Sequence, residues 1–568
     1  MNRKIWKALG IAVCMLALAA PRAMAETNSH YVSDGRSFKK AIETINNSSD
    51  DNENEIILTS GFTLEGDTTE YTLRRGTTTI KGEGNTITVN PGAGITVTGE
   101  RTVLNLGAEG YAEKLTIDGN AKGAFITVSG GATAHMYENV TLQNRQQVDQ
   151  ACVVLEENSV FNMHGGVIQN CKGKYGGVSL KNGSRFIMEG GTISGCSASE
   201  GGGLYATNQS TITISGGTIS GCTAGGGGGL YAENNSTITI SGGKIEDNEV
   251  TRSGGGLLVK GSTLNIEGEG GTISGCKGTM GGGLYADNST ITIKGGTISG
   301  CTETSMGGGL YVIGSNLTIE GGTISECTAK SMGGGLYAEN STITISGGTI
   351  EKNRAMYGGG VALNSSTINN PIKNWKVIGN EAYKLDSSIG GIGGGIYLTN
   401  GSMNVSAGSN KIYNNTADIH GADICLEKDA SITLPDAANM GATYLNSGIN
   451  IDNWYNDNPR HNPSENGKVD AGVELKGKQS LVASYEASPV YIKIDANGGV
   501  GGSGSQTVQK GTNVTLEAPT KEGHLFKGWK DEKGNSYPAG EDGKVKITVT
   551  GDMTLTAVWE ARTFTVTY

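Results

Sequence analysis

Acidic side chains are the first place to look for chemistry in this chain of 568 residues. Two carboxylates on either side of a glycosidic bond act as acid and base, and carboxylates stacked on neighbouring strands hold Ca²⁺. The densest acidic clusters, Glu246–Arg252 and Glu351–Arg354, each place acids beside an arginine and lie far apart in the chain. The sequence therefore predicts neither a catalytic carboxylate pair nor a metal site, and no cofactor.

Two histidine–glycine pairs and one series of charged residues do not change the prediction that catalytic and metal sites are lacking. His164 and His420 each precede a glycine, which resembles a fragment of the galacturonase signature, but the paired aspartates of that signature are missing. The charges of Glu267, Lys294 and Glu320 alternate in sign at one repeat position, which favours pairing between neighbouring strands. We interpret the histidines as incidental and the charged series as stabilising.

A tyrosine that recurs at one repeat position is the strongest candidate for binding. It follows an apolar residue that alternation places inside, so its ring should point outward. Flat apolar rings with polar hydroxyl edges are enriched at recognition sites, while stacked rings also stabilise parallel strands by themselves. Both interpretations stay open. The candidate binding face consists of Tyr205, Tyr231, Tyr285, Tyr311, Tyr337 and Tyr397.

These tyrosines belong to a repeated unit, which predicts stacked supersecondary elements. Its central copy, residues 216–241, reads GGTISGCTAGGGGGLYAENNSTITIS, in which apolar and polar residues alternate as in half-buried strands. Glycine runs break these strands, so one coil per unit predicts a parallel β-helix. The apolar residue after each glycine run recurs in steps of 25 to 28 residues with one step of 35: Val153, Val178, Leu204, Leu230, Leu257, Leu284, Leu310, Leu336, Val361, Ile396 and Ile424.

The amino terminus and the composition indicate export. Residues 1–25 combine basic residues, an apolar run and Ala23-Met24-Ala25, which predicts a secretory signal peptide too short to span a membrane. With 93 glycines and 6% aromatic residues, the chain suits thin apolar columns better than one large globular core. The net charge of −11 disfavours nucleic acid as a partner. We expect a monomeric rod, secreted or at the cell surface, with no transmembrane span.

Most cysteines share one position of the unit, where asparagine stands in other coils. We interpret this position as an internal turn stack, in which asparagine bonds to the backbone and cysteine is a small buried apolar residue. Cys425 falls at an outward position, so we expect it to be exposed. The shared position holds Cys171, Cys196, Cys222, Cys276, Cys301 and Cys327, and Asn248, Asn353, Asn380 and Asn415.

The region before the regular repeats predicts a cap. Ser37–Ile45 spaces apolar residues at helical intervals, with Ser37 as the expected N-cap, and this helix would cover the open end of the coil stack. The following TTTIKGEGNTITV resembles the start of a pectin-lyase-like right-handed β-helix. The repeats, Ile-x-x-Asn/Cys followed by Gly-Gly-Leu/Ile/Val, are similar to those of polymorphic outer-membrane proteins and other β-helical surface adhesins. Over about Val32–Leu434 this resemblance implies an all-β fold and a surface role.

The carboxy-terminal region resembles the Listeria–Bacteroides repeat of internalin B-type surface proteins, a small β-grasp-like module. The match rests on IDANGG at 494–499, GHLFKGW at 523–529 and DMTLTAVW at 552–559, and it implies a stalk or spacer. The predicted organisation is a signal peptide at 1–25, a β-helix with its cap at 26–434, an exit cap and linker at 435–489, the repeat at 490–560, and the truncated start of a further repeat at 561–568.

Together these features predict an exported, non-catalytic rod that acts as an adhesin or interaction protein. Its expected partners are glycans or surface proteins of a host or of the environment. The alternative is a β-helical carbohydrate-active enzyme, a polysaccharide lyase or a glycoside hydrolase, with a site in the diverged coils before Val153 or in the long step before Ile396. New reducing ends or unsaturated uronates released from polysaccharides would favour the enzyme.

Overall fold

A computed structural model gives the structure of this chain. The predicted signal peptide, most of the predicted linker and the predicted further repeat beyond residue 562 lie outside the described residues. The structure describes residues 27–49, 53–66, 68–119, 123–146, 150–369, 375–384, 390–404, 411–413, 415–433, 454–457, 468–469, 474–476, 478–482, 489–509, 513–540, 542–549 and 551–562.

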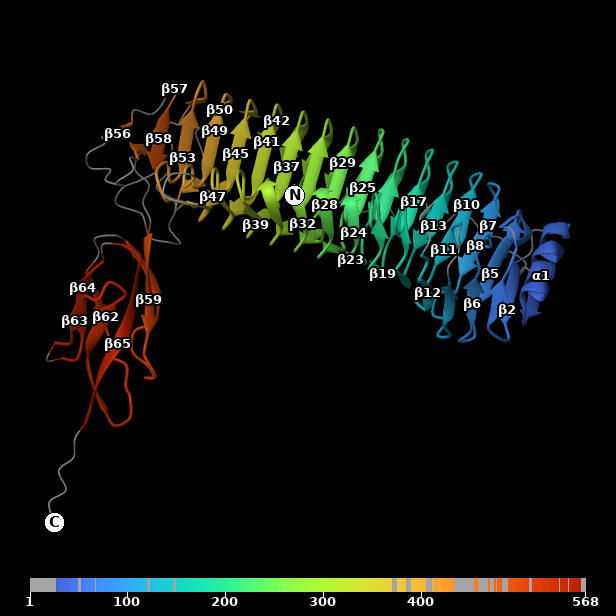
Figure 1. The fold of residues 1–568 in the computed structure, drawn as a ribbon, viewed down its shortest axis with the longest axis horizontal. Helices are drawn as coiled ribbons and strands as arrows, with labels where there is room; N and C mark the ends of the chain where they lie inside the picture. Colours follow the sequence, from blue (N-terminus) through green and yellow to red (C-terminus); the bar gives the residue numbers. More distant parts are fainter. Residues whose placement is uncertain are drawn as a thin grey trace, which may run out of the picture. The chain divides into compact units, whose positions relative to one another are not determined.

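The chain divides into two units, which we describe in turn. The first unit comprises Met1–Ala224 with Asn234–Thr237, and the second comprises Gly225–Glu233 with Ile238–Tyr568. In each unit short parallel strands form the successive coils of a β-solenoid (Figure 1). Counted over both units there are about 14 turns, and the described residues contain one short α-helix. The predicted fold class is confirmed.

One coil of the first unit shows how alternation makes the core. It consists of β13 (Val153–Leu155), β14 (Val160–Met163), β15 (Val167–Gln169) and β16 (Lys172–Gly173). Each strand pairs in parallel with the equivalent strand of the next repeat, so Val153 lies beside Val178 and Phe161 beside Phe186. All four side chains are fully buried. Inward residues at equal register therefore stack into continuous apolar columns.

The helix α1 (Gly35–Asn47) covers the amino-terminal end of the first unit (Figure 1). Its apolar face is buried, and the ring of Phe38 lies 5.6 Å from that of Phe62. The predicted cap helix is confirmed, but the prediction that Ser37 is the N-cap is wrong. Asp34 caps the helix: its Oδ1 accepts a hydrogen bond from Ser37 N at 2.7 Å, and the Ser37 hydroxyl accepts from Asp34 N at 3.1 Å.

One regular coil of the second unit shows why glycine recurs. It consists of β33 (Leu284–Asp287), β34 (Thr290–Ile293), β35 (Thr297–Ser299) and β36 (Thr302–Met306), and a run of three glycines leads to β37 (Leu310–Ile313). Gly307 has a φ of +74°, which side chains rarely adopt. A Cβ at Gly309 would lie 2.5 Å from the carbonyl oxygen of Gly335. Glycine is required here by conformation and by close packing of coils.

The shared cysteine–asparagine position is a buried column in both units. The eight cysteines in the described residues are buried free thiols. In the second unit, Asn353 Nδ2 donates to the carbonyl of Ile324 at 2.9 Å, and its Oδ1 accepts from Cys327 N at 2.9 Å. The prediction is confirmed: asparagine bonds to the turn backbone, and cysteine fills the same space as a small apolar residue.

Antiparallel strands continue two sheets of the second unit past its last coil. The pairs are β54 (Ser431–Thr433) with β57 (Glu474–Lys476), and β53 (Ile424–Glu427) with β58 (Gln479–Val482). Strand β58 places the Ser480 hydroxyl 3.8 Å from Cys425 Sγ, and His420 Nδ1 also lies 3.8 Å from Cys425 Sγ. Cys425 is therefore buried, which corrects the prediction that it is exposed, and burial raises its thiol pKa to about 12.

The carboxy-terminal part of the second unit is a small sheet domain. Its five-stranded sheet has the order β60 (Gln506–Gln509), β59 (Pro489–Asp495), β65 (Met553–Ala561), β62 (His524–Asp531) and β63 (Ser536–Pro538). A second pair, β61 (Asn513–Leu516) and β64 (Val545–Thr548), packs its apolar side chains against this sheet. Trp529, Leu516 and Leu555 lie in the shared core. The domain thus has a hydrophobic core of its own.

Candidate functional site

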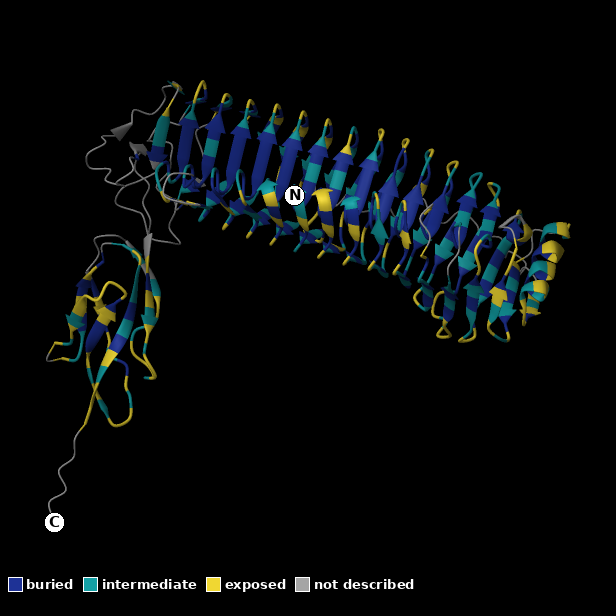
Figure 2. Cartoon of the chain, in the orientation of Figure 1, coloured by how far each residue is buried: buried dark blue, intermediate teal, exposed yellow. Residues whose placement is uncertain are grey.

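The recurring tyrosines follow the inward residues of strands such as β37, but most of them are not exposed. Figure 2 shows β37 and its neighbours largely in the colour of buried residues. The exposed fraction is 3% for Tyr205, 8% for Tyr231, 5% for Tyr311 and 3% for Tyr337, and Tyr285 and Tyr397 are half-buried. The prediction of an exposed ring face is therefore wrong for four of the six.

Stacking between coils buries these rings. The ring centroids of Tyr285 and Tyr311 lie 5.1 Å apart, and those of Tyr311 and Tyr337 lie 5.0 Å apart, because their strands pair in register. Methionine side chains pack against the same rings. We call this cluster the methionine–tyrosine strip: Met280, Tyr285, Met306, Tyr311, Ile313, Met332, Tyr337, Ala362 and Tyr397.

The polar edge of the strip is acidic. The hydroxyls of Tyr311 and Tyr337 both donate to Oε2 of Glu339, at 3.3 Å each. Burial and the charge of Glu339 raise the pKa of Tyr337 to about 12, so this hydroxyl stays protonated at neutral pH. Two coils away, burial and the charge of Asp287 raise the pKa of Tyr285 as well. The strip thus combines apolar side chains with carboxylates along one edge.

Glu303 is a buried acid in the regular coils that the sequence analysis missed. It lies on β36 beside Gly278 and Ala329, and only 7% of it is exposed. One carboxyl oxygen accepts from Ser305 N, whereas Oε1 has no hydrogen-bond partner in the described residues. Burial raises the pKa of Glu303 to about 8, against the effect of nearby backbone N–H groups. The carboxyl group is therefore mostly uncharged at neutral pH.

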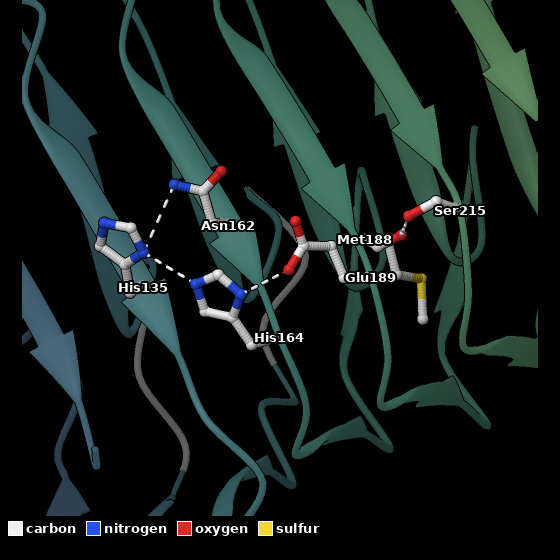
Figure 3. A network of polar contacts seen from close by, with 6 residues as sticks. All are labelled: His135, Asn162, His164, Met188, Glu189 and Ser215. Atoms are coloured by element: carbon white, nitrogen blue, oxygen red, sulfur yellow. Dashed lines mark hydrogen bonds and ion pairs between the residues drawn. The ribbon is translucent and has the colours of Figure 1, made fainter. Parts of the chain in front are cut away.

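A second missed cluster joins three consecutive coils of the first unit (Figure 3). His135 belongs to β11 (Thr133–Met136). His164 directly follows β14, and Glu189 directly follows β18 (Arg185–Met188), which pairs with β14. His135 Nδ1 lies 2.9 Å from His164 Nε2, and His164 Nδ1 lies 2.7 Å from Glu189 Oε2. We call these three residues the histidine chain. The Asn162 amide nitrogen lies 3.5 Å from His135 Nδ1.

The two imidazoles of the histidine chain meet edge to edge. Their planes differ by 6°, and their nearest nitrogens are closer than the spacing of about 3.5 Å between stacked rings. The rings of His135 and His164 must therefore nearly share a plane, as a hydrogen bond between ring nitrogens requires. The ring of Tyr137, 5.0 Å from that of His164, lies alongside.

With both imidazoles neutral, one arrangement of protons satisfies the two short contacts. An ionised Glu189 accepts from Nδ1–H of His164, so Nε2 of His164 carries a lone pair and accepts from Nδ1–H of His135. The remaining nitrogen, Nε2 of His135, is then unprotonated and points away from the other two residues (Figure 3). Burial and the neighbouring His164 lower the pKa of His135, so this half-buried ring is a free base at neutral pH.

The sequence contains a signal for this cluster in the register of its repeats. Met136, Met163 and Met188 occupy one inward column. Aligning the repeats on this methionine places Tyr137, His164 and Glu189 in one outward row. The interpretation of His164 as incidental considered only the glycine that follows it, Gly165, and not the place of His164 in this outward row.

The other charged candidates form local pairs. Arg354 Nε lies 3.1 Å from Glu381 Oε2, and its guanidinium group lies 4.3 Å from the centre of the Tyr383 ring. Lys294 Nζ lies 3.8 Å from Glu267 Oε1 at half-exposed positions. In the residues that the structure describes, no group of three or more His, Cys, Asp or Glu side chains is arranged to hold a metal ion.

The carboxy-terminal domain has a shallow hollow of about 650 Å³. Lys521, Lys530 and Trp559 are among the residues that line it. Lys521 donates to the carbonyl of Asn497 at 3.1 Å, and its ammonium group lies 5.8 Å from the centre of the Trp559 ring. These contacts hold the loop around Asn497 against the sheet.

No helix within the described ranges is long and apolar enough to cross a membrane.

Comparison with known proteins agrees with the coiled architecture. Residues 103–269 and 256–458 match the family described as right-handed β-helix region. These matches cover more than half of the chain, and the chain belongs to the right-handed β-helix family. The resemblance to right-handed β-helices, which rests on the entry helix and TTTIKGEGNTITV, is confirmed at this level.

The carboxy-terminal domain matches a second family. Residues 489–563 match the divergent InlB B-repeat domain, which is typical of surface proteins. A protein of Evansella cellulosilytica, named as a candidate Gly-rich membrane protein, is 35% identical over 101 residues, which are 16% of this chain and 10% of that protein. The chain thus spans about a tenth of the length of this relative. No solved structure matches the chain.

Proposed function

We propose that this chain is an exported surface protein that binds a partner protein along the methionine–tyrosine strip. The observation that carries the proposal is the strip itself, an apolar row that runs over consecutive coils of the second unit and stays partly exposed at Met280, Met306 and Met332. Contiguous apolar surface on a folded protein marks an interaction site, and methionine adapts its shape to a partner.

The burial of the rings favours a protein partner over a glycan. A sugar would need a flat ring face, but the faces of Tyr311 and Tyr337 are occupied by their neighbours. The accessible groups are methionine thioethers and the carboxylates of Asp287 and Glu339. A complementary partner presents an apolar stripe beside lysine or arginine side chains.

The surface location rests on two further features. The InlB B-repeat domain at residues 489–563 is typical of surface proteins, and residues 1–25 have the pattern of a secretory signal. The β-solenoid supplies a rigid support that repeats the same side chains at each coil, which suits an extended contact with a partner.

The test replaces the accessible methionines and leaves the buried rings in place. The full chain without its predicted signal peptide is labelled with a fluorophore, and its binding to whole epithelial cells is measured. Because the three methionines supply the accessible apolar surface, Met280→Ser, Met306→Ser and Met332→Ser combined should weaken binding at least about tenfold. Protease treatment of the cells should remove the binding of the parent chain.

A triple change elsewhere in the second unit is the matched control. Thr292, Thr318 and Thr344 occupy one outward position on three consecutive coils, as the methionines do, and their combined replacement by serine should leave binding unchanged. Circular dichroism must show the same fold for both variants. If the methionine variant binds as well as the parent, or if binding survives protease but not glycosidase treatment, the proposal of a protein-binding strip is wrong.

A further inference from the structure

The histidine chain supports an activity in addition to binding, and it shares no residue with the strip. We propose that His135 is a general base that activates water for the hydrolysis of a carboxylic ester, with His164 and Glu189 as positioning residues and the Asn162 amide as the donor to the developing oxyanion. The proposal departs from the sequence-based expectation of a non-catalytic rod.

Two short contacts orient the base. A catalytic base needs a partner that fixes its tautomer and stabilises the charge it gains, and in the serine protease triad a carboxylate does this for histidine. Here Glu189 holds His164 at 2.7 Å, and His164 holds His135 at 2.9 Å. Both contacts join adjacent coils whose strands pair in register, so the coils themselves keep the base in place.

The base and the amide are both accessible from solvent. His135 and Asn162 stand side by side on neighbouring coils, on the outer face of their sheet, and both are only partly buried. The free Nε2 of His135 points away from His164 and Glu189 (Figure 3). A water molecule and a substrate can therefore reach the base, while the ring of Tyr137 covers the side of His164.

The residues of the histidine chain and Asn162 suit one class of substrate, a carboxylic ester. Hydrolysis of a glycosidic bond needs two carboxyl groups on either side of the bond, and Glu189 is engaged with His164. Elimination from a uronic acid needs positive charge to hold the substrate carboxylate, and none of His135, Asn162, His164 and Glu189 supplies it in this protonation state. Ester hydrolysis needs a base and a hydrogen-bond donor for an oxyanion, and His135 with Asn162 provides both.

The reaction balances with water as the only co-substrate. Nε2 of His135 takes a proton from water as the water oxygen bonds to the acyl carbon, and the carbonyl becomes an oxyanion that accepts a hydrogen bond from Asn162 Nδ2–H. Collapse of this intermediate breaks the bond to the alcohol oxygen, which takes the proton back from His135. The products are a carboxylic acid and an alcohol, and the histidine chain returns to its starting state.

The test measures hydrolysis of para-nitrophenyl acetate by the full chain without its predicted signal peptide. His135→Gln should lower the rate at least about a hundredfold, the range expected for loss of a general base. Glu189→Gln should lower the rate less than His135→Gln does. It should also move the pH–rate midpoint to lower pH, because the lost negative charge no longer favours the protonated form of His135. A purely structural role of Glu189 would not move that midpoint.

Exposed histidines hydrolyse activated esters slowly without a site, so a second histidine is the control. His524→Gln, in the carboxy-terminal domain, should leave the rate unchanged. Asn162→Ala should lower kcat more than it raises KM, since the amide acts on the oxyanion. Equal rates for the parent and a folded His135→Gln variant, or equal losses in the His135 and His524 variants, would overturn the proposal, and neither outcome bears on the strip.

Discussion

The regular coils of the second unit and the diverged coils of the first use the same outward row in different ways. In the second unit this row holds Glu267 and Lys294, a half-exposed ion pair at 3.8 Å. Such pairs contribute little to stability. In the first unit the equivalent row holds His164 and Glu189, joined to each other at 2.7 Å and to His135. The row that only pairs charges in one unit joins a histidine to a carboxylate and to a second histidine in the other.

The difference teaches how to interpret a repeat protein from its sequence. Where the copies are nearly identical, each side chain packs on a copy of itself, as the rings of Tyr285 and Tyr311 do. Where the copies diverge at a half-buried row, unlike side chains meet, and unlike polar groups can exchange protons. Identity between repeats therefore indicates packing, and divergence at one row is the better signal for chemistry.

Glu303 is an exception within the regular coils, because Gly278 and Ala329 occupy its position in the neighbouring coils, and its replacement should change stability most. Its pKa of about 8 lies above the ordinary 4.5, so the folded chain holds a proton that the unfolded chain releases between these values. Stability should therefore fall as pH rises from about 4.5 to 8. Glu303→Ala should remove this loss and stabilise the chain by up to about 4 kcal/mol above pH 8. Urea denaturation across this pH range measures the gain.

The matched control for this prediction is Glu320→Ala, an exposed acid on the next coil. It should change stability by less than about 0.5 kcal/mol at every pH. If Glu303→Ala destabilises the chain at alkaline pH, the carboxylate has a compensating partner outside the described residues, and the burial argument fails.

The asparagine column of the second unit stabilises its coils by buried hydrogen bonds. Asn380 Oδ1 accepts from the backbone and side-chain nitrogens of Asn353 at 2.9 Å and 3.0 Å, and its Nδ2 donates to the carbonyl of Ile350 at 3.0 Å. Asn380→Ala leaves these buried groups unpaired and should cost about 3 kcal/mol. Thermal unfolding followed by circular dichroism measures the loss. A cost below about 1 kcal/mol would mean that water enters the column and replaces the amide.

Much of the fold follows from the sequence for a simple physical reason. Period-two alternation, glycine runs and a constant step between marker residues leave few ways to bury the apolar side chains other than stacked coils. The N-cap is Asp34 rather than the predicted Ser37. Both residue types are good caps, and only the helix geometry decides between them. The exposure of Cys425 was mispredicted because the strand that covers it, β58, lies outside the repeat.

The sites were harder to predict because they depend on contacts between coils. Alternation correctly separates the tyrosines from the inward leucines, but it does not show that rings on adjacent coils bury one another, as Tyr311 and Tyr337 do. The His135–His164 bond joins residues of adjacent coils that are not directly opposite in the ladder. Finding it requires the register of the coils, which the sequence gives only when the repeats are aligned on the inward methionines.

The smallest expected effect concerns the thiols that share the column with asparagine. Cys301 is fully buried, and its Sγ lies 3.4 Å from the carbonyl oxygen of Ser299. Burial raises the pKa of Cys171 well above its usual value, so that thiol does not form the reactive thiolate.

A reducing agent should therefore leave the Tm of the chain without its signal peptide unchanged, and iodoacetamide should modify the thiols only after unfolding. Cys301→Ala should cost about 1 kcal/mol, less than Asn380→Ala, because a thiol satisfies fewer backbone groups than an amide. A fall in stability of several kcal/mol on reduction would show that disulfides cross the coils, and the column would then hold the coils together by covalent bonds rather than by packing.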